Sequence, residues 1–135
     1  MRKIDDICII DDDTITVFGI RKMLGLVVDC ENIVSYANGK LALEGIKAMY
    51  RKTDRVPSVI FLDINMPIMD GWQFLAEFIA MPLNQKVRIN VVTSSIAPLD
   101  RKQYEDFKER TSHTLSFNNK PLRKQHMAKI TKMVD

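Results

Sequence analysis

The fold follows most directly from residues 58–71, which read Ser-Val-Ile-Phe-Leu-Asp-Ile-Asn-Met-Pro-Ile-Met-Asp-Gly. The first part, Ser58 to Asp63, is apolar almost throughout and ends on a carboxylate. A short continuous apolar run is typical of a central strand that is covered on both faces. The part that follows contains Pro67 and an Asp-Gly pair, which are turn signals. We therefore predict a buried strand whose carboxyl end opens into a polar loop.

Similar apolar runs lie on both sides of this stretch and alternate with amphipathic segments. The spacing of Ile20, Met23, Leu24 and Val27 predicts one such helix. Short strands that alternate with helices predict a parallel sheet with the helices packed outside it. The predicted strands are Ile7–Asp11, Asn32–Tyr36, Ser58–Asp63, Val87–Thr93 and Thr114–Phe117, and the later helices are a segment after Asn38-Gly39, Trp72–Ala80, Pro98–Arg110 and Leu122–Val134.

These five strand-helix units predict an α/β protein with a doubly wound, five-stranded parallel sheet. The chain has 135 residues, which fits one domain. A content of 46% hydrophobic and 27% charged residues is an ordinary globular balance. We therefore expect residues 1–135 to form a single domain.

Polar side chains lie at the carboxyl ends of four of the predicted strands. Asp11 and Asp12 lie at the end of the first, Asp63 of the third, Thr93 of the fourth and Lys120 of the fifth. The carboxyl ends of parallel strands share one edge of a sheet, and ligands bind at that edge. Carboxylates, a hydroxyl and an ammonium at one point suit a divalent cation together with a phosphoryl group.

The acidic run Asp11-Asp12-Asp13 has two interpretations. Acidic residues stabilise a helix amino terminus by about 0.3–1 kcal/mol each, and capping can account for one or two of the three. Adjacent carboxylates after a buried strand also suit a cation, and Mg²⁺ uses one or two carboxylates together with waters. We favour the metal site over capping, and both roles can hold at once.

Asp63 is either a turn residue at a strand end or a nucleophile. A carboxylate can attack phosphorus and form an acyl phosphate when a nearby cation reduces the repulsion between two anions. Thr93 and Lys120 carry weak signals alone, but beside carboxylates Thr93 can donate to a phosphoryl oxygen and Lys120 can pair with an anion. Pro121 favours an extended conformation at Lys120 and is a candidate for a cis peptide bond.

Four separated blocks, in order, resemble the receiver domain of two-component response regulators. They are Ile-Ile-Asp-Asp-Asp, Leu-Asp-Ile-Asn-Met-Pro-Ile-Met-Asp-Gly, Val-Val-Thr-Ser and Asn-Lys-Pro-Leu. The second block is quite specific, and the ordered set covers nearly the whole chain. The resemblance implies a flavodoxin-like (βα)5 fold with strand order 2-1-3-4-5, which the architecture also predicts.

The same resemblance implies a role for each site residue. Asp63 would receive a phosphoryl group from a histidine kinase or a histidine phosphotransfer protein in a reaction that needs Mg²⁺. Thr93 and Lys120 would contact that group, and Phe117 falls at the position of the switch aromatic. The implied Mg²⁺ ligands are Asp11, Asp12, Asp63 and the backbone carbonyl of Asn65.

We further expect a stand-alone receiver in the cytoplasm, with no output domain and no enzymatic activity beyond its own phosphorylation and dephosphorylation. Such a protein would signal by binding an unknown downstream protein or by relaying phosphate. Two other classes stay open. A phosphate-ester hydrolase commonly carries an aspartate two residues after its nucleophile, and that position is Asn65 here. A binding module that works without phosphorylation would have no need of the five site residues.

Charge and composition limit the classes of partner that are expected. The last 35 residues carry nine basic and four acidic side chains, which is typical of a solvated helix face or of a surface for an acidic partner. No interleaving of aromatic and basic residues accompanies this charge, so nucleic acid is not expected as a partner. No apolar run approaches the ~20 residues that span a bilayer, so no membrane is expected either.

Several residues of chemical interest have simpler interpretations. Two cysteines, Cys8 and Cys30, lack a metal spacing, and a buried thiol is expected at Cys8. Trp72 is predicted to be a partly exposed residue at a helix start. His113 and His126 have no carboxylate or cysteine at a useful spacing, and both are predicted to lie on the surface.

Overall fold

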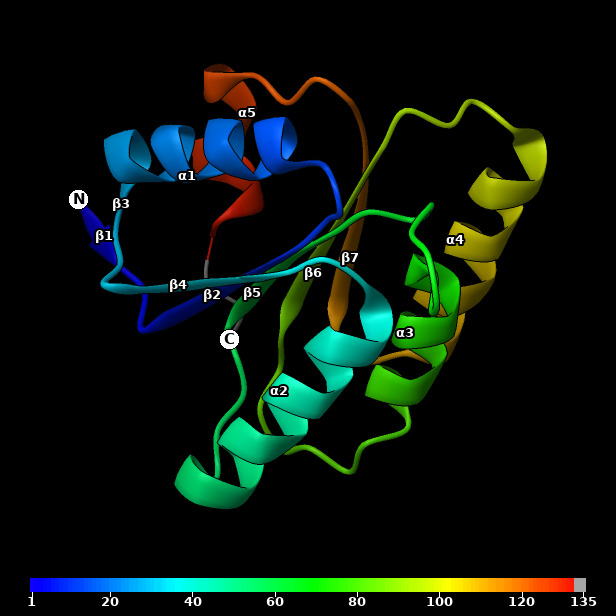
Figure 1. Cartoon of the computed structure of the whole chain (residues 1–135), viewed down its shortest axis with the longest axis horizontal. Coiled ribbons are helices and arrows are strands. Elements are labelled where there is room, and N and C mark those ends of the chain that lie inside the picture. The colour runs from blue at the N-terminus through cyan, green and yellow to red at the C-terminus, as the bar shows by residue number, and fades with distance from the viewer. Residues whose placement is uncertain (133–135) are drawn as a thin grey trace.

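A parallel β-sheet with helices on both faces forms the body of the protein (Figure 1). The computed structural model describes residues 1–132. The strands of the main sheet are β2 (Asp6–Ile10), β4 (Asn32–Tyr36), β5 (Val59–Leu62), β6 (Arg88–Thr93) and β7 (Thr114–Asn119). The helices are α1 (Thr14–Val27), α2 (Gly39–Thr53), α3 (Gly71–Ile79), α4 (Pro98–Arg110) and α5 (Lys124–Ile130).

The order of the strands across the main sheet is β4-β2-β5-β6-β7, and every neighbouring pair is parallel. Counted along the chain within this sheet, the order is 2-1-3-4-5, so the predicted fold class is confirmed. Val59 of β5 pairs with Ile7 of β2 on one side and with Arg88 of β6 on the other. β5 is therefore internal, and its four residues are all buried, as the apolar run predicts.

The core has two layers, one on each face of the sheet. One layer packs the sheet against α1 and α5 through residues such as Ile20, Leu24 and Met127. The other packs it against α2, α3 and α4 through residues such as Ile46 and Phe78. The two groups of helices lie on opposite sides of the ribbon of strands in Figure 1. Both faces of the central strands are thus covered.

The structure adds a small sheet that was not predicted. β1 (Arg2–Lys3) and β3 (Val28–Asp29) pair in parallel beside the amino end of the main sheet. The backbone N–H of Ile4 extends this pairing by donating to the carbonyl of Asp29 at 3.0 Å. Strands of two residues carry no readable alternation, so no sequence pattern could predict them.

The carboxyl-terminal part differs in length from the prediction. β7 continues past Phe117 to Asn119, and α5 is shorter than the predicted helix Leu122–Val134. The predicted end at Val134 lies outside the described residues. The Lys120–Pro121 peptide bond is cis, as the sequence suggested. Among helices in the described part of the chain, none has both the length and the apolar character needed to cross a bilayer.

Candidate functional site

Four neighbouring strands bring the predicted site residues to one edge of the sheet. Asp11 follows β2, Asp63 follows β5, Thr93 ends β6 and Lys120 follows β7. Two backbone hydrogen bonds continue the sheet past the strand ends. The Asp63 N–H donates to the Ile10 carbonyl at 2.8 Å, and the Lys120 N–H donates to the Thr93 carbonyl at 2.9 Å. The backbone therefore holds these residues side by side.

Three carboxylates meet at this edge. Asp11, Asp12 and Asp63 each place one oxygen so that all three lie within 4.8 Å of one another. Asp11 and Asp63 are buried, with 5% and 6% of their surfaces exposed, while Asp12 is open to solvent. Anionic oxygens gathered this closely, in part away from water, form a donor set that fits a hard divalent cation.

The acidic run divides between a helix cap and the carboxylate cluster. The Asp13 side chain caps α1, since one of its oxygens accepts from the Ile15 N–H at 3.0 Å and the other from the Thr16 hydroxyl at 2.8 Å. These hydrogen bonds lower the pKa of Asp13. Asp11 and Asp12 instead belong to the carboxylate cluster. Capping thus accounts for the third aspartate of the run and leaves the first two for a cation.

The ammonium group of Lys120 supplies positive charge to this carboxylate cluster. Its Nζ lies 3.0 Å from Oδ2 of Asp11 and 3.7 Å from Oδ2 of Asp63. Burial alone would lower the pKa of Lys120, but the hydrogen bond that its ammonium donates to Asp11 and the charges of Asp11 and Asp63 raise it overall. The ammonium therefore stays charged and offsets part of the repulsion among the carboxylates.

The Asp63 carboxyl has an unusual environment. Burial, and then the charge of Asp11, raise its pKa to about 6 in the absence of a cation, although Lys120 acts in the opposite direction. Its Oδ1 accepts from the Ile64 N–H at 2.8 Å, which fixes the orientation of the group and leaves Oδ2 near Lys120. A bound cation would restore the ionised form that a nucleophile needs.

The turn after Asp63 requires glycine at position 71. The Gly71 N–H donates to the Ile64 carbonyl at 2.8 Å, so α3 begins directly against the site. A Cβ on Gly71 would collide with the carbonyl oxygen of Asp63. Asp70 caps the same helix in a capping box with Gln73. The Asp-Gly pair of the sequence is thus explained by one cap and one close backbone approach.

The remaining predicted residues flank the cluster. Thr93 is fully buried, and its Oγ1 accepts from the Ser95 N–H at 3.0 Å. The half-buried ring of Phe117 lies 5.3 Å from the Tyr104 ring of α4 and 5.0 Å from the Arg101 guanidinium, measured to ring centroids. Asn65 lies two residues past Asp63 and is exposed. The roles of Thr93, Phe117 and the Asn65 carbonyl stay predictions.

Two expectations about surface residues are wrong. Trp72 is only 7% exposed, and its Nε1 donates to Asp100 at 3.0 Å. His113 is half-buried, and its Nδ1 accepts from the Val87 N–H at 3.0 Å while its ring packs 5.4 Å from that of Phe78. Both side chains find partners far away in the sequence, which local spacing cannot reveal. His126 is exposed, as predicted.

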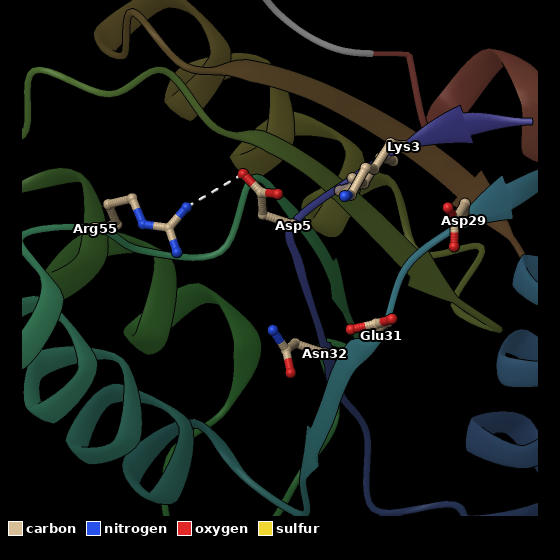
Figure 2. Close-up of a pocket in the computed structure, with 7 residues that line it drawn as sticks. Lys3, Asp5, Asp29, Glu31, Asn32 and Arg55 are labelled. Carbon is tan, nitrogen blue, oxygen red and sulfur yellow. Dashed lines mark hydrogen bonds and ion pairs between the residues drawn. The ribbon is translucent and has the colours of Figure 1, made fainter.

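A second polar hollow lies at the opposite, amino edge of the same sheet (Figure 2). Arg55 binds Asp5 at 3.2 Å there and Asp6 at 3.5 Å. Asp29 and Glu31 line the same hollow on the approach to β4. These carboxylates do not belong to the cluster at the carboxyl edge.

The fold and the site are those of a small α/β domain. Its doubly wound parallel sheet carries a largely buried carboxylate cluster and a lysine at its carboxyl edge. The model of the response regulator receiver domain family matches residues 7–131. The chain therefore belongs to this family, whose members are signalling domains of two-component systems. This agrees with the resemblance drawn from the four sequence blocks.

Individual relatives support the assignment. A two component response regulator from Cytophaga hutchinsonii is 27% identical, covers 96% of both chains and superposes with a TM-score of 0.77. A CheY-like receiver domain protein from Methanospirillum hungatei JF-1 is 25% identical over 93% of this chain and 89% of that chain, with a TM-score of 0.67. A protein-glutamate methylesterase/protein-glutamine glutaminase from Methanosarcina acetivorans is 36% identical over 63 residues, which are 47% of this chain and 16% of that protein.

Proposed function

We propose that Asp63 accepts a phosphoryl group from a histidine kinase or a histidine phosphotransfer protein, and that the protein then signals by binding another protein or by relaying phosphate. One observation carries the proposal. A buried carboxylate beside two further carboxylates and a lysine has the charge balance of a nucleophile that needs a cation. Because the family is one of signalling domains, this chemistry serves a switch and not turnover of a metabolite.

Asp11, Asp12 and Asp63, together with the carbonyl of Asn65, are the residues that would hold Mg²⁺. When bound, this ion would supply positive charge that offsets the repulsion between Asp63 and an incoming phosphoryl group. Lys120 adds a second positive charge beside Asp11 and Asp63. The fit rests on the all-oxygen donor set and on the burial of two of its three carboxylates.

The reaction step follows from the position of Asp63. An oxygen of its carboxylate attacks phosphorus, the bond between phosphorus and the donor imidazole nitrogen breaks, and the electron pair returns to that nitrogen. Lys120 pairs with an oxygen of the transferred group, and the Thr93 hydroxyl donates a hydrogen bond to another. The product is an acyl phosphate on Asp63 and a histidine freed of phosphate.

An apolar hollow beside Lys120 offers a place for the phosphoryl donor. Ile15, Gly19 and Met23 of α1 line it together with Pro121 and Leu122. Ile15 is 80% exposed although it is apolar, which is typical of a surface that a partner covers. We propose that the donor packs on this hollow while its histidine reaches Asp63.

The experiment is phosphorylation by acetyl phosphate with Mg²⁺, followed by intact-mass measurement. We expect one phosphoryl group per chain, and we expect Asp63→Asn to abolish it. Asp29→Asn, which removes a carboxylate from the opposite edge, is the matched control and should be labelled as the wild type is. Labelling that persists in Asp63→Asn at another residue would overturn the proposal.

Two other functions fit the site less well. A phosphate-ester hydrolase would turn over a generic phosphate ester steadily, and the amide side chain of Asn65 cannot serve as its acid or base. A binding module independent of phosphorylation would hold its partner equally well with and without beryllofluoride, a mimic of the acyl phosphate. The presence of all five polar site residues favours the phosphoryl acceptor over both.

A further inference from the structure

A chain of hydrogen bonds links Thr93 to the start of α3 by way of α4. The Ser95 N–H donates to Oγ1 of Thr93 at 3.0 Å, and the Ser95 hydroxyl donates to Oδ2 of Asp100. The other carboxylate oxygen of Asp100, Oδ1, accepts from Nε1 of Trp72 at 3.0 Å. Asp100 lies in the first turn of α4, so it joins elements that are far apart in the sequence.

Trp72 contacts α4 at two places. Its indole N–H reaches Asp100 near the start of the helix, and its ring stacks on Phe107, with centroids 5.7 Å apart and planes inclined by 10°. Trp72 directly follows Gly71, whose backbone lies against Asp63. The Trp72 side chain therefore lies between the loop that follows Asp63 and α4, and a displacement of either one changes its surroundings.

We propose that Asp100 is a positioning residue that couples the state of Thr93 to Trp72 and to the placement of α4. The inference rests on the proposed function, because it needs Thr93 to move when Asp63 carries a phosphoryl group. Ser95 follows Thr93 through the bond from its N–H, and its hydroxyl then changes the position of the Asp100 carboxylate.

Geometry makes this coupling sensitive. Hydrogen bonds weaken steeply outside a narrow range of distance and angle, so one carboxylate held from two sides cannot keep both bonds through a shift of about 1 Å. Bonds to an ionised acceptor are stronger than neutral ones, and Asp100 is partly shielded from water. A shift of the loop at Ser95 therefore moves the Asp100 carboxylate and strains or breaks its hydrogen bond with Trp72.

Trp72 is the single tryptophan of the chain, so its fluorescence reports this coupling without interference from another indole. The experiment records Trp72 emission at saturating Mg²⁺, with and without beryllofluoride, while isothermal titration calorimetry measures beryllofluoride binding independently. In the wild type we expect beryllofluoride to shift the emission beyond the effect of Mg²⁺ alone. In Ser95→Ala we expect most of that shift to be lost while binding persists.

Two further variants complete the test. Ser94→Ala changes the exposed neighbouring serine, and its emission shift should match that of the wild type. Asp100→Ala removes the acceptor of the Trp72 N–H, so its emission should differ already with Mg²⁺ alone and should respond little to beryllofluoride. A purely structural role for Ser95 would change the starting spectrum and the melting temperature but would leave the response to beryllofluoride in place.

The outcomes separate the coupling from the proposed function. A full emission shift in Ser95→Ala, or no shift in a wild type that binds beryllofluoride, overturns the coupling alone. If calorimetry detects no binding and acetyl phosphate does not label Asp63, both proposals fall together.

Discussion

The two edges of the main sheet carry similar residues in very different environments. At the carboxyl edge, the side chains of Asp11 and Asp63 are 3% and 8% exposed, and they face Lys120, which is 17% exposed. At the amino edge, the side chains of Asp5 and Arg55 are 62% and 52% exposed. Figure 2 shows the carboxylates of this amino edge lying apart from one another around an open hollow.

Burial, and not residue type, separates the two edges. Exposed ion pairs such as the one between Arg55 and Asp5 contribute about 0–1 kcal/mol, because water and salt screen them. Desolvated charges interact strongly and shift one another's protonation. The pKa of about 6 at Asp63 is a consequence of this burial and of the charge of Asp11. The carboxyl edge is therefore the one where repulsion among carboxylates is strong and where a bound cation would relieve it.

The largest expected difference is the response to Mg²⁺. A ligand that binds only the folded state raises the free energy of unfolding by about 2.7 kcal/mol at a concentration of 100 times its Kd. We expect saturating Mg²⁺ to stabilise the wild type by an amount of this order in urea denaturation. Asp12→Asn should lose most of this gain, because it removes one of the three carboxylates that would hold the ion. Asp12 is exposed, so the substitution leaves the core intact.

Asp29→Asn is the matched control for that measurement, since it removes a carboxylate at the amino edge. It should keep the full stabilisation by Mg²⁺. Equal stabilisation of the wild type and Asp12→Asn, or a loss in Asp29→Asn alone, would place the cation elsewhere and break the contrast between the edges.

A smaller difference is expected when one cation is removed from each edge. Without Mg²⁺, Lys120→Met leaves the carboxylates of Asp11 and Asp63 without their partner and should cost about 1–2 kcal/mol, which is less than for a fully buried pair because Lys120 reaches solvent. Arg55→Met should cost under about 0.5 kcal/mol. Urea denaturation of both variants at the same ionic strength measures the two values.

Salt provides the control for the pair of variants. Added salt should erase the small effect of Arg55→Met and should leave most of the effect of Lys120→Met, because buried pairs are screened less. Equal costs for the two substitutions would show that burial does not separate the edges.

The sequence predicts the local elements well where their signals are local. The short strand Asn32–Tyr36 and the polar helix Pro98–Arg110 are predicted with their observed bounds. Because parallel strands share an edge, the convergence of Asp11, Asp63 and Lys120 follows from their positions at strand ends. What the sequence could not predict is which of three adjacent aspartates caps a helix, since that depends on the turn after Ile10.

Contacts between distant segments could not be predicted either. Trp72 and Asp100, which are joined by a hydrogen bond, are 28 residues apart, and no periodicity relates them. His113 accepts from a backbone N–H at the start of the neighbouring strand, 26 residues away. An indole or an imidazole next to a turn is usually exposed, so only the packing of α3 against α4 and of β6 against β7 reveals that these two are covered.

The smallest expected effect concerns His113, a covered group on the amino side of β6 and β7. Burial lowers its pKa, so the unfolded chain binds the proton more tightly than the folded protein does. Its contribution to the free energy of unfolding is therefore complete above the usual pKa of about 6.5 and declines as the pH falls below it. The raised pKa of Asp63 acts in the opposite direction over the same range, because the folded protein binds that proton more tightly.

The difference between the wild type and His113→Asn isolates the histidine, since Asn keeps an acceptor for the Val87 N–H but does not titrate. We expect the wild type to lose more stability than His113→Asn between about pH 8 and about pH 5.5 in urea denaturation, with His126→Asn behaving as the wild type does. An identical pH dependence in all three proteins would mean that covering a group at the amino edge has no electrostatic consequence, and the contrast would then belong to the carboxylate cluster and not to burial.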